Sequence, residues 1–341
     1  MTLVRESCYP GKLVVIDGIS GTGKTLLNGL IGLFGDSHLP FFSYIIEQLC
    51  ITNHLKHLDD EAAHILLKLQ IDQKRYDHQI GREVNVRPRD LSSLLRSSKK
   101  TKYLNYFLAK DGAPAESMIY KKPTNLIVVT HQLLHASSIL EDIYGDSMVR
   151  IHAMRHPAYL YDHWVSCIGL IARSLRDFTP WIKINGEVIP WFLHGELKLK
   201  SFKNLSDNDK AAICVIKLSE NAMSFHKTFK LKSNYLAFDF ENFVLNPSEY
   251  VVKSRDVLGV YNPRKVANYL SREKVPRVHI NSGRSRKIYH RYGSKNLNSQ
   301  KNQRIDYEQK IDQIKNSVSR EFQSRYIEVI NDYENVFGLW F

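Results

Sequence analysis

The sequence predicts an α/β fold with three layers and a mostly parallel central sheet. Residues 12–27, KLVVIDGISGTGKTLL, read as a buried strand, a glycine-rich loop and the start of a helix. Three further apolar runs, at residues 125–130, 148–154 and 235–240, have the length of strands buried on both faces. Helical patterns lie between these runs, and such alternation is typical of parallel βαβ units.

The glycine-rich loop has the spacing of a phosphate-binding loop, and we therefore expect a P-loop fold. Gly18, Gly23, Lys24 and Thr25 fill the pattern G-x-x-x-x-G-K-S/T. In this pattern backbone N–H groups point at phosphate oxygens, and the helix that follows directs its positive end toward them. The alternative is a glycine-rich turn without a ligand. The residues expected to contact the bound phosphate compound are Gly18, Gly21, Thr22, Gly23, Lys24, Thr25 and Leu26.

The remaining elements follow from periodicity and turn signals. Apolar spacings of three and four residues predict helices at 41–58, 60–83, 137–144, 158–177, 207–231, 241–259 and 305–335. Asn185 and Gly186 lie between two short β-like runs and predict a hairpin at residues 181–190. Residues 84–122 carry turn signals and are expected to form an insertion that helps to shape an acceptor pocket.

Two basic side chains follow directly after predicted strands. His131 ends the run at 125–130, and Arg155 ends the run at 148–154, just before Pro157. In open α/β sheets ligands bind at the carboxyl ends of the strands. His131 suits a general base at neutral pH, although a histidine at a strand end can also be a hydrogen-bonded structural residue. Arg155 is expected to contact a phosphate or, failing that, a carboxylate partner.

Composition bounds the class of protein. A chain of 341 residues with 43% hydrophobic content can bury a large core. No apolar run approaches the about 18 to 20 residues that a membrane span needs, and the N-terminus lacks a signal-peptide pattern, so a soluble cytoplasmic protein is expected. The four cysteines are far apart and show no metal-ligand spacing with histidine, which indicates ordinary thiols.

The net charge of +13 is concentrated near the C-terminal end. Residues 262–304 hold twelve Lys and Arg residues against one acid, Glu273. This segment is either a solvated basic loop or an anion-binding segment, and Arg284 and Arg286 are its candidate ligands. The expected organisation is a P-loop domain at 1–261, with its insertion at about 84–122, and a segment at 262–341 that packs on the same domain.

Four stretches together resemble the sulfotransferase superfamily, whose members use 3′-phosphoadenosine 5′-phosphosulfate as donor and share a P-loop kinase-like fold. They are GISGTGKTLL at 18–27, LIVVTHQLL at 126–134, VRIHAMRHPAYLYDHW at 149–164 and YLAFDFENFVLNPSEYVVKSRDVLGV at 235–260. No single stretch is specific. Their order and spacing carry the resemblance, which spans roughly residues 12–259.

The resemblance implies transfer of a sulfuryl group to a hydroxyl or amine acceptor, such as a carbohydrate or another anionic molecule, with no metal required. Lys24 would stabilise the bridging oxygen and the moving group, His131 would deprotonate the acceptor, and Arg155 would hold the donor's 3′-phosphate. A C-terminal basic loop with Arg284 and Arg286 would close the 3′-phosphate site.

The chain departs from the family pattern at two positions. Gly21 stands where the family usually carries a catalytic Lys or Arg. His163 stands eight residues after Arg155, where the family has a serine of the 3′-phosphate site, and Ser166 follows one helical turn later. His163 remains our candidate donor to that phosphate.

Two other functions stay open from the sequence. The intact G-x-x-x-x-G-K-T pattern also fits an ATP-dependent kinase or ATPase in which Thr25 and Asp17 hold Mg²⁺, although no second acidic strand motif accompanies it. The basic segment also fits a nucleic-acid-binding protein, although no known nucleic-acid module surrounds it, so nucleic acid is not an expected partner. Asp239 and Glu241 are expected to orient helices and loops.

Overall fold

The computed structural model describes residues 3–6, 10–88, 90, 92–97, 99–108, 123–169, 171, 177–196, 202–284 and 302–341. Arg286 and parts of the predicted insertion and basic segment lie outside the described residues.

The core is a five-stranded sheet in which every recorded pairing is parallel, in the order β2-β3-β1-β4-β7. The strands are β1 (Leu13–Gly18), β2 (Phe41–Phe42), β3 (Leu126–Val129), β4 (Met148–Met154) and β7 (Tyr235–Asp239). Strand β1 lies at the centre because it pairs with β3 on one side and β4 on the other. The prediction of a mostly parallel central sheet is confirmed, and the loop after β1 opens where the strand order reverses.

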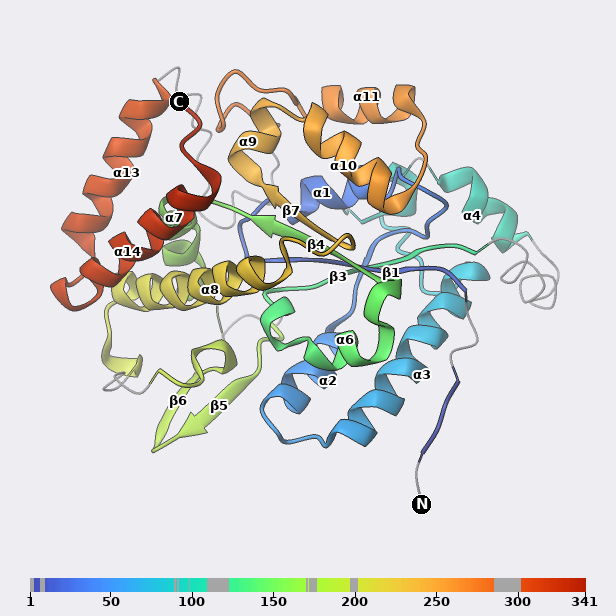
Figure 1. The fold of residues 1–341 in the computed structure, drawn as a ribbon, viewed down its shortest axis with the longest axis horizontal. Coiled ribbons are helices and arrows are strands. Elements are labelled where there is room, and N and C mark those ends of the chain that lie inside the picture. The colour runs from blue at the N-terminus through green and yellow to red at the C-terminus, as the bar shows by residue number, and fades with distance from the viewer. Residues whose placement is uncertain are drawn as a thin grey trace.

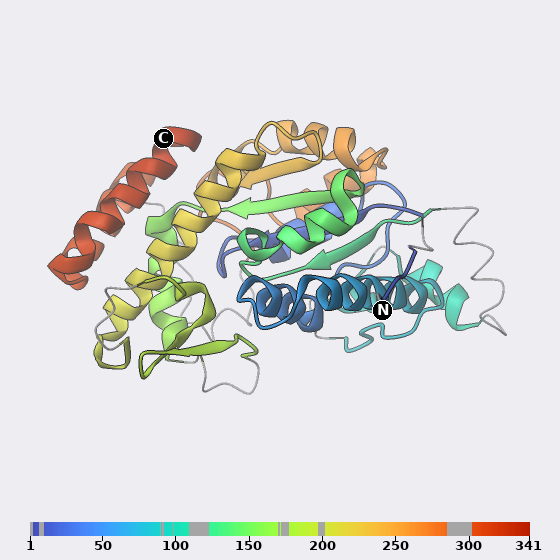
Figure 2. The ribbon, with the colours of Figure 1, turned by 60° about the horizontal axis from the view of Figure 1, so that its bottom comes forward.

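Helices cover both faces of the sheet and complete the three layers (Figure 1). One face is covered by α1 (Lys24–Ile31), α9 (Phe240–Leu245), α10 (Ser248–Leu258) and α11 (Pro263–Arg272). The other face is covered by α2 (Tyr44–His54), α3 (Asp60–Gln79) and α6 (Ser138–Tyr144), which come forward in Figure 2. Buried strand side chains such as Val14 and Ile16 are packed between the two helical layers.

A group of longer helices gathers at one end of the sheet (Figure 1). Helix α8 (Asp207–Phe229) packs against α7 (Pro157–Ile168) and α14 (Arg320–Phe337), and α13 (Gln303–Ser317) packs on α7. The predicted start of α8 is confirmed, because Ser206 Oγ accepts a hydrogen bond from the Asp209 N–H at 3.1 Å. The described part of residues 262–341 therefore packs on the elements that precede it.

The predicted hairpin is also confirmed. Strands β5 (Trp181–Ile184) and β6 (Glu187–Pro190) pair antiparallel. Asn185 and Gly186 connect them with φ values of 51° and 86°. Both residue types tolerate positive φ, which the tight turn requires.

Several predicted boundaries were wrong. The single C-terminal helix at 305–335 is two helices, because the chain turns at Val318, which is buried, and Ser319 precedes α14. The predicted helix at 41–58 begins as the edge strand β2, which pairs with β3. Helix α11 lies inside the basic segment at 262–304, where no helix was predicted. The edge strand depends on its pairing with β3, whereas α11 begins at a local signal, because the Asn262 side chain accepts a hydrogen bond from the Lys265 N–H and Pro263 follows it.

The remaining elements are short. They are α4 (Lys100–Phe107) in the insertion and the 3₁₀ turns Leu94–Arg96, Leu134–Ala136, Gly145–Ser147, Trp191–Leu193 and Phe202–Asn204. Cys50 and Cys214 are buried free thiols and Cys167 is a half-buried one. Among the helices described, none combines the length and the apolar character needed to cross a bilayer.

Candidate functional site

The loop between β1 and α1 depends on three glycines with positive φ. Gly18, Gly21 and Gly23 take φ values of 151°, 98° and 88°, which side chains other than glycine rarely adopt. Gly23 also has no room for a side chain, because an added Cβ would lie 2.5 Å from the Phe240 ring. The order of strand, glycine-rich loop and helix predicted from the sequence is present, with Gly23 at the N-cap of α1, and phosphate binding by this loop stays a prediction.

Lys24 is folded back into this loop. Its Nζ donates hydrogen bonds to the carbonyl oxygens of Gly18 and, at 3.1 Å, Ile19, and the residue is 7% exposed. Burial lowers the pKa of Lys24 to about 8, while the Asp17 and Glu47 carboxylates favour its charged form. A buried ammonium held by neutral carbonyls is suited to exchange them for a charged phosphate or sulfate oxygen.

Asp17 joins the ends of two strands beneath the loop. One carboxylate oxygen accepts a hydrogen bond from Thr130 Oγ1 at 2.8 Å and the other from the Leu134 N–H at 2.9 Å. Burial by itself would raise the pKa of Asp17. The Lys24 ammonium and the backbone N–H donors together have a stronger opposite effect, so the pKa of Asp17 is lowered. Both oxygens are thus engaged within the protein, which disfavours the predicted alternative of Asp17 as a Mg²⁺ ligand.

His131 forms a pair with Glu47. His131 Nδ1 lies 3.1 Å from Glu47 Oε1, and the two side chains are 31% and 8% exposed. Burial raises the pKa of Glu47 despite the opposing effect of His131. With the carboxylate accepting from Nδ1, the Nε2 atom is the nitrogen available to an acceptor.

Glu47 was missed by the sequence analysis. It lies on α2 within the buried face formed with Ile46, Cys50 and Ile51. An acid on the apolar stripe of a helix was the signal that could have revealed it, since a buried carboxylate needs a partner. Periodicity could not name that partner, because His131 is 84 residues away in sequence.

Arg155 lies beside the loop, where the strand pattern predicted it. Its Nη1 donates to the Gly21 carbonyl at 2.7 Å, and its Nε lies 3.5 Å from Glu241 Oε1. The guanidinium also lies 4.7 Å from the centroid of the Phe240 ring. The carboxylate partner considered as the alternative is therefore present, and Glu241 is fully buried.

A second guanidinium lies over the same ring. Arg277 is 5.4 Å from the Phe240 centroid, and burial together with Arg155 lowers its pKa to about 10. Arg284 is further out and pairs with Glu273 at 3.7 Å. The Arg284 side chain is half exposed, and the neighbouring Gly283 lies against the Arg277 guanidinium, whereas Arg286 is outside the described residues.

His163 contacts the loop through Ser20. Its Nε2 lies 3.0 Å from Ser20 Oγ, and burial lowers its pKa to about 4, with further lowering by Arg155 and Lys24. The imidazole is therefore neutral at pH 7. Ser166, one turn further along α7, donates instead to the Asp162 carbonyl at 2.9 Å.

The other predicted loop residues have structural contacts as well. Thr22 is buried and donates to the Ile19 carbonyl at 2.8 Å, and the Leu26 carbonyl accepts from the Tyr269 hydroxyl at 2.8 Å. Thr25 is half-buried at the first turn of α1. These contacts fix the shape of the cradle.

Asp239 and Glu241 orient neighbouring elements, as expected. Asp239 accepts a hydrogen bond from the Tyr333 hydroxyl of α14 at 2.7 Å. Glu241 accepts one from the His156 N–H at 3.2 Å. Burial and the adjacent Asp239 raise the pKa of Glu241, although Arg155 acts in the opposite direction.

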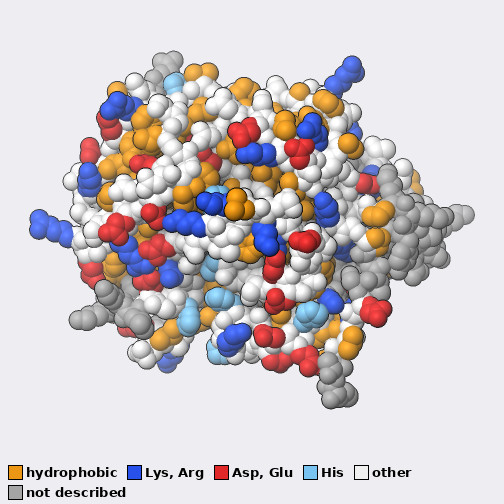
Figure 3. Space-filling view, in the orientation of Figure 1, with side chains coloured by type: hydrophobic (Ala, Val, Ile, Leu, Met, Phe, Trp, Pro, Cys, Tyr) orange, Lys and Arg blue, Asp and Glu red, His pale blue; other side chains and the backbone are white. Residues whose placement is uncertain are grey.

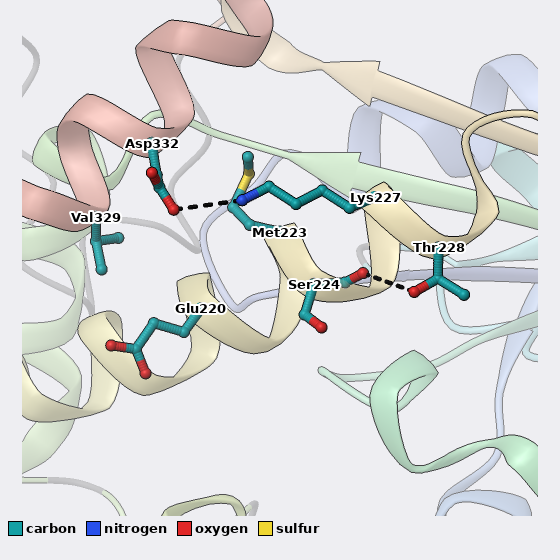
Figure 4. A pocket seen from close by; sticks show the side chains of 7 residues that line it. All are labelled: Glu220, Met223, Ser224, Lys227, Thr228, Val329 and Asp332. Atoms are coloured by element: carbon teal, nitrogen blue, oxygen red, sulfur yellow. Dashed lines mark hydrogen bonds and ion pairs between the residues drawn. The ribbon is translucent and has the colours of Figure 1, made fainter.

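A groove of about 430 Å³ lies apart from this site, between α8 and α14 (Figure 4). Its polar groups are paired within the protein: Lys227 lies 3.5 Å from Asp332, the Thr228 hydroxyl donates to the Ser224 carbonyl, and Glu220 pairs with Arg325. It lacks the glycine loop and the strand ends that make up the candidate site. We therefore keep the phosphate loop and the strand ends, and not this groove, as the candidate site.

Two further observations concern the nucleic-acid and metal-dependent alternatives. On the face shown in Figure 3, Lys and Arg are interspersed with Asp and Glu rather than gathered in one patch, which gives no sign there of a nucleic-acid track. Within the described ranges no three His, Cys, Asp or Glu side chains are grouped so as to hold a metal ion.

No family model and no curated protein matches the chain. Among the solved structures similar to it over most of its length, three are described here. The sulfotransferase domain of the Synechococcus PCC 7002 olefin synthase has 14% identity and a TM-score of 0.44, with 98% of each chain covered. The sulfotransferase domain of the curacin biosynthetic pathway has 13% identity and a TM-score of 0.40, covering 95% of this chain and 98% of the other.

The third similar structure is a sulfotransferase from Mycobacterium avium, with 9% identity and a TM-score of 0.41, covering 96% of this chain and 77% of the other.

Proposed function

We propose that the protein transfers a sulfuryl group from 3′-phosphoadenosine 5′-phosphosulfate to a hydroxyl or amine acceptor. The observation that carries this proposal is the position of Glu47. Its carboxylate accepts a hydrogen bond from His131 and also interacts electrostatically with Lys24. The cation of the phosphate loop and the imidazole at the end of β3 therefore belong to one connected site.

Each residue has a role that its contacts support. The loop amides and Lys24 bind the 5′-phosphosulfate, and Lys24 leaves the carbonyls of Gly18 and Ile19 to neutralise charge on the bridging oxygen. Glu47 holds His131 so that Nε2 faces the acceptor. Arg155, beside the loop, binds the 3′-phosphate, with His163 and the basic segment that includes Arg284 and Arg286 closing that end.

In this proposal the protein's own residues carry out the proton transfer and charge stabilisation, and no metal takes part. His131 Nε2 removes the proton from the acceptor hydroxyl or amine as its oxygen or nitrogen forms a bond to sulfur. The bond between sulfur and the bridging phosphate oxygen breaks, and the electron pair leaves with 3′-phosphoadenosine 5′-phosphate. Lys24 stabilises that negative charge.

Calorimetric titration with 3′-phosphoadenosine 5′-phosphate, and separately with ATP and Mg²⁺, tests the donor. We expect the 3′-phosphorylated nucleotide to bind without metal, and Arg155→Ala to weaken it. Preference for ATP with Mg²⁺ would instead identify a kinase or ATPase and overturn the proposal. Binding of nucleic acid that falls steeply with salt and survives Lys24→Ala would point to the nucleic-acid alternative.

A further inference from the structure

A buried pair of carboxyl groups lies beside Arg155. Asp239 ends β7, Glu241 lies in the first turn of α9, and the two residues are 2% and 0% exposed. Arg155 Nε lies 3.5 Å from Glu241 Oε1. Two buried carboxylates beside this guanidinium would carry excess negative charge. A proton on one of them removes that excess, because like charges at short range disfavour the ionisation of both groups.

The geometry indicates that the proton is on Glu241. Its contact with Arg155 is longer than the about 2.7 to 2.9 Å of a charge-assisted hydrogen bond. Neither Arg155 Nε nor Glu241 Oε1 has a hydrogen-bond partner among the described residues. Burial and the neighbouring Asp239 also raise the pKa of Glu241 to about 8. At pH 7 Glu241 is therefore largely neutral, and Arg155 stays available to an anion.

Tyr333 of α14 determines which of the two carboxyl groups is the anion. Its hydroxyl has one proton and donates it to Asp239 Oδ1 at 2.7 Å, whereas Glu241 Oε2 lies 3.5 Å away. Asn242 Nδ2 donates to the other oxygen of Asp239. A hydrogen bond to the charged form of a group favours that form. These two donors therefore stabilise Asp239 as the carboxylate and leave the proton on Glu241.

We propose that Tyr333 is a positioning residue for the donor: its hydroxyl keeps the negative charge on Asp239, so that Glu241 does not compete with the 3′-phosphate for Arg155. This inference rests on the proposed function, because it concerns the same arginine. Helix α14 reaches this position by packing against α7, the helix that follows Arg155 (Figure 1). The hydroxyl acts through the two carboxyl groups and not on the donor itself.

The other titratable or charged groups described around this pair keep their charge state at pH 7. They are His156, Tyr159 and His163 on α7, Tyr250 on α10, Tyr333 on α14 and Arg277. Burial lowers the pKa of the two histidines and raises that of the three tyrosines, and it lowers the pKa of the guanidinium only to about 10. The charge that a substitution of Tyr333 changes is therefore the one shared by Asp239 and Glu241.

The test compares the Kd for 3′-phosphoadenosine 5′-phosphate in Tyr333→Phe and in Tyr326→Phe by calorimetry at pH 7. Tyr326 is the matched control, because it is a buried tyrosine on the same helix whose hydroxyl donates to the Pro157 carbonyl at 3.1 Å. We expect the Kd to rise about tenfold in Tyr333→Phe, the effect of weakening one charged hydrogen bond, and by less than about twofold in Tyr326→Phe.

Glu241→Gln added to Tyr333→Phe separates the effect of charge from that of shape. The amide fits the same space and can accept from the His156 N–H, but it cannot become an anion. We expect the double variant to recover donor affinity to within about threefold of wild type. A cavity or a shift of α14 would not be repaired by this second substitution, so recovery identifies the charge on Glu241 as the cause.

Carboxyl-carbon NMR of the donor-free protein at pH 7 locates the proton directly. Wild type should show Glu241 protonated and Asp239 ionised, and Tyr333→Phe should move the proton toward Asp239. A Glu241 carboxyl that stays protonated in Tyr333→Phe would overturn the inference, whether or not the double variant folds.

The outcomes separate this inference from the proposed function. Equal Kd values for Tyr333→Phe and Tyr326→Phe, or a loss that remains in the folded double variant, would overturn the inference and leave the sulfuryl-transfer proposal intact. A wild type that binds no donor would contradict the proposed function. The NMR comparison, which needs no donor, then tests by itself whether Tyr333 places the proton on Glu241.

Discussion

Gly21 and His163 fit against each other at the phosphate loop. A Cβ added to Gly21 would lie 2.8 Å from His163 Cδ2, closer than side-chain carbons approach. These are the two positions at which the chain departs from the sulfotransferase pattern. The departures are thus connected: the imidazole of His163 occupies space that a longer side chain at position 21 would need.

Substitution of Gly21 should reveal this contact. We expect Gly21→Ala to lower the free energy of unfolding by about 2 kcal/mol or more, because it combines strain at φ 98° with the clash against His163. Adding His163→Ala should restore part of that loss, with a coupling energy of about 0.5 to 3 kcal/mol. Denaturant unfolding measures both.

The matched control for backbone strain alone is Gly186→Ala. Gly186 has a similar φ of 86° but nothing within 4 Å of an added Cβ. Its cost should be smaller, about 1 kcal/mol, and independent of His163. Equal losses for the two glycines, or strictly additive effects of Gly21→Ala and His163→Ala, would contradict the proposed contact.

Removal of the loop lysine should affect donor binding directly. Lys24→Ala leaves the anion with backbone donors only, so we expect the Kd for 3′-phosphoadenosine 5′-phosphate to rise at least about tenfold, in line with loss of a charged hydrogen bond. Calorimetry at fixed salt measures the change. Lys232→Ala, at an exposed lysine after α8, should bind like wild type. Unchanged affinity in Lys24→Ala would remove Lys24 from the site.

The lowered pKa of Lys24 predicts a pH effect with a defined sign. The pKa is about 8 in the folded protein against 10.5 for an unperturbed lysine. Between these values the unfolded chain binds more protons, so this residue makes the free energy of unfolding of the donor-free protein rise with pH. Below pH 8 both states are protonated and this dependence disappears.

Donor binding should reverse that pKa shift. A phosphate or sulfate beside Lys24 favours the ammonium, so binding at about pH 9 should take up close to one proton. Calorimetry in two buffers of different ionisation enthalpy measures the uptake. We expect none in Lys24→Ala, and uptake that persists in that variant would assign the proton to another group.

The pair of His131 and Glu47 predicts two different losses. We expect His131→Ala to lower kcat by about a hundred- to ten-thousand-fold, the usual contribution of general base catalysis, with donor affinity retained. Glu47→Gln should lower kcat by a smaller factor, because the amide no longer holds Nδ1 as a carboxylate does. Glu47→Asp should recover part of the rate.

The readouts of this prediction are kcat and the donor Kd measured together. Glu328→Gln, at an exposed position of α14, is the control for loss of one negative charge. If Glu47→Gln changed only stability and left kcat unchanged, Glu47 would be a structural residue and not one that positions His131.

The sequence alone was sufficient for the parts of the protein that depend on local pattern. The spacing of Gly18, Gly23 and Lys24 predicted the loop, because only a few backbone conformations place those residue types between a strand and a helix. Apolar runs predicted β3, β4 and β7, since strands of a parallel sheet are buried on both faces. His131 and Arg155 followed from their positions after those strands.

Tertiary structure decided which side chains meet across long separations in sequence. Glu47 became part of the site because α2 brings it beside His131 at the end of β3, and the Phe42 and Tyr44 rings reach His131 in the same way. The same applies to the Glu241 partner of Arg155 and to the fit of His163 against Gly21. Periodicity reports which face of an element is buried, whereas the identity of the partner on that face depends on how the elements pack.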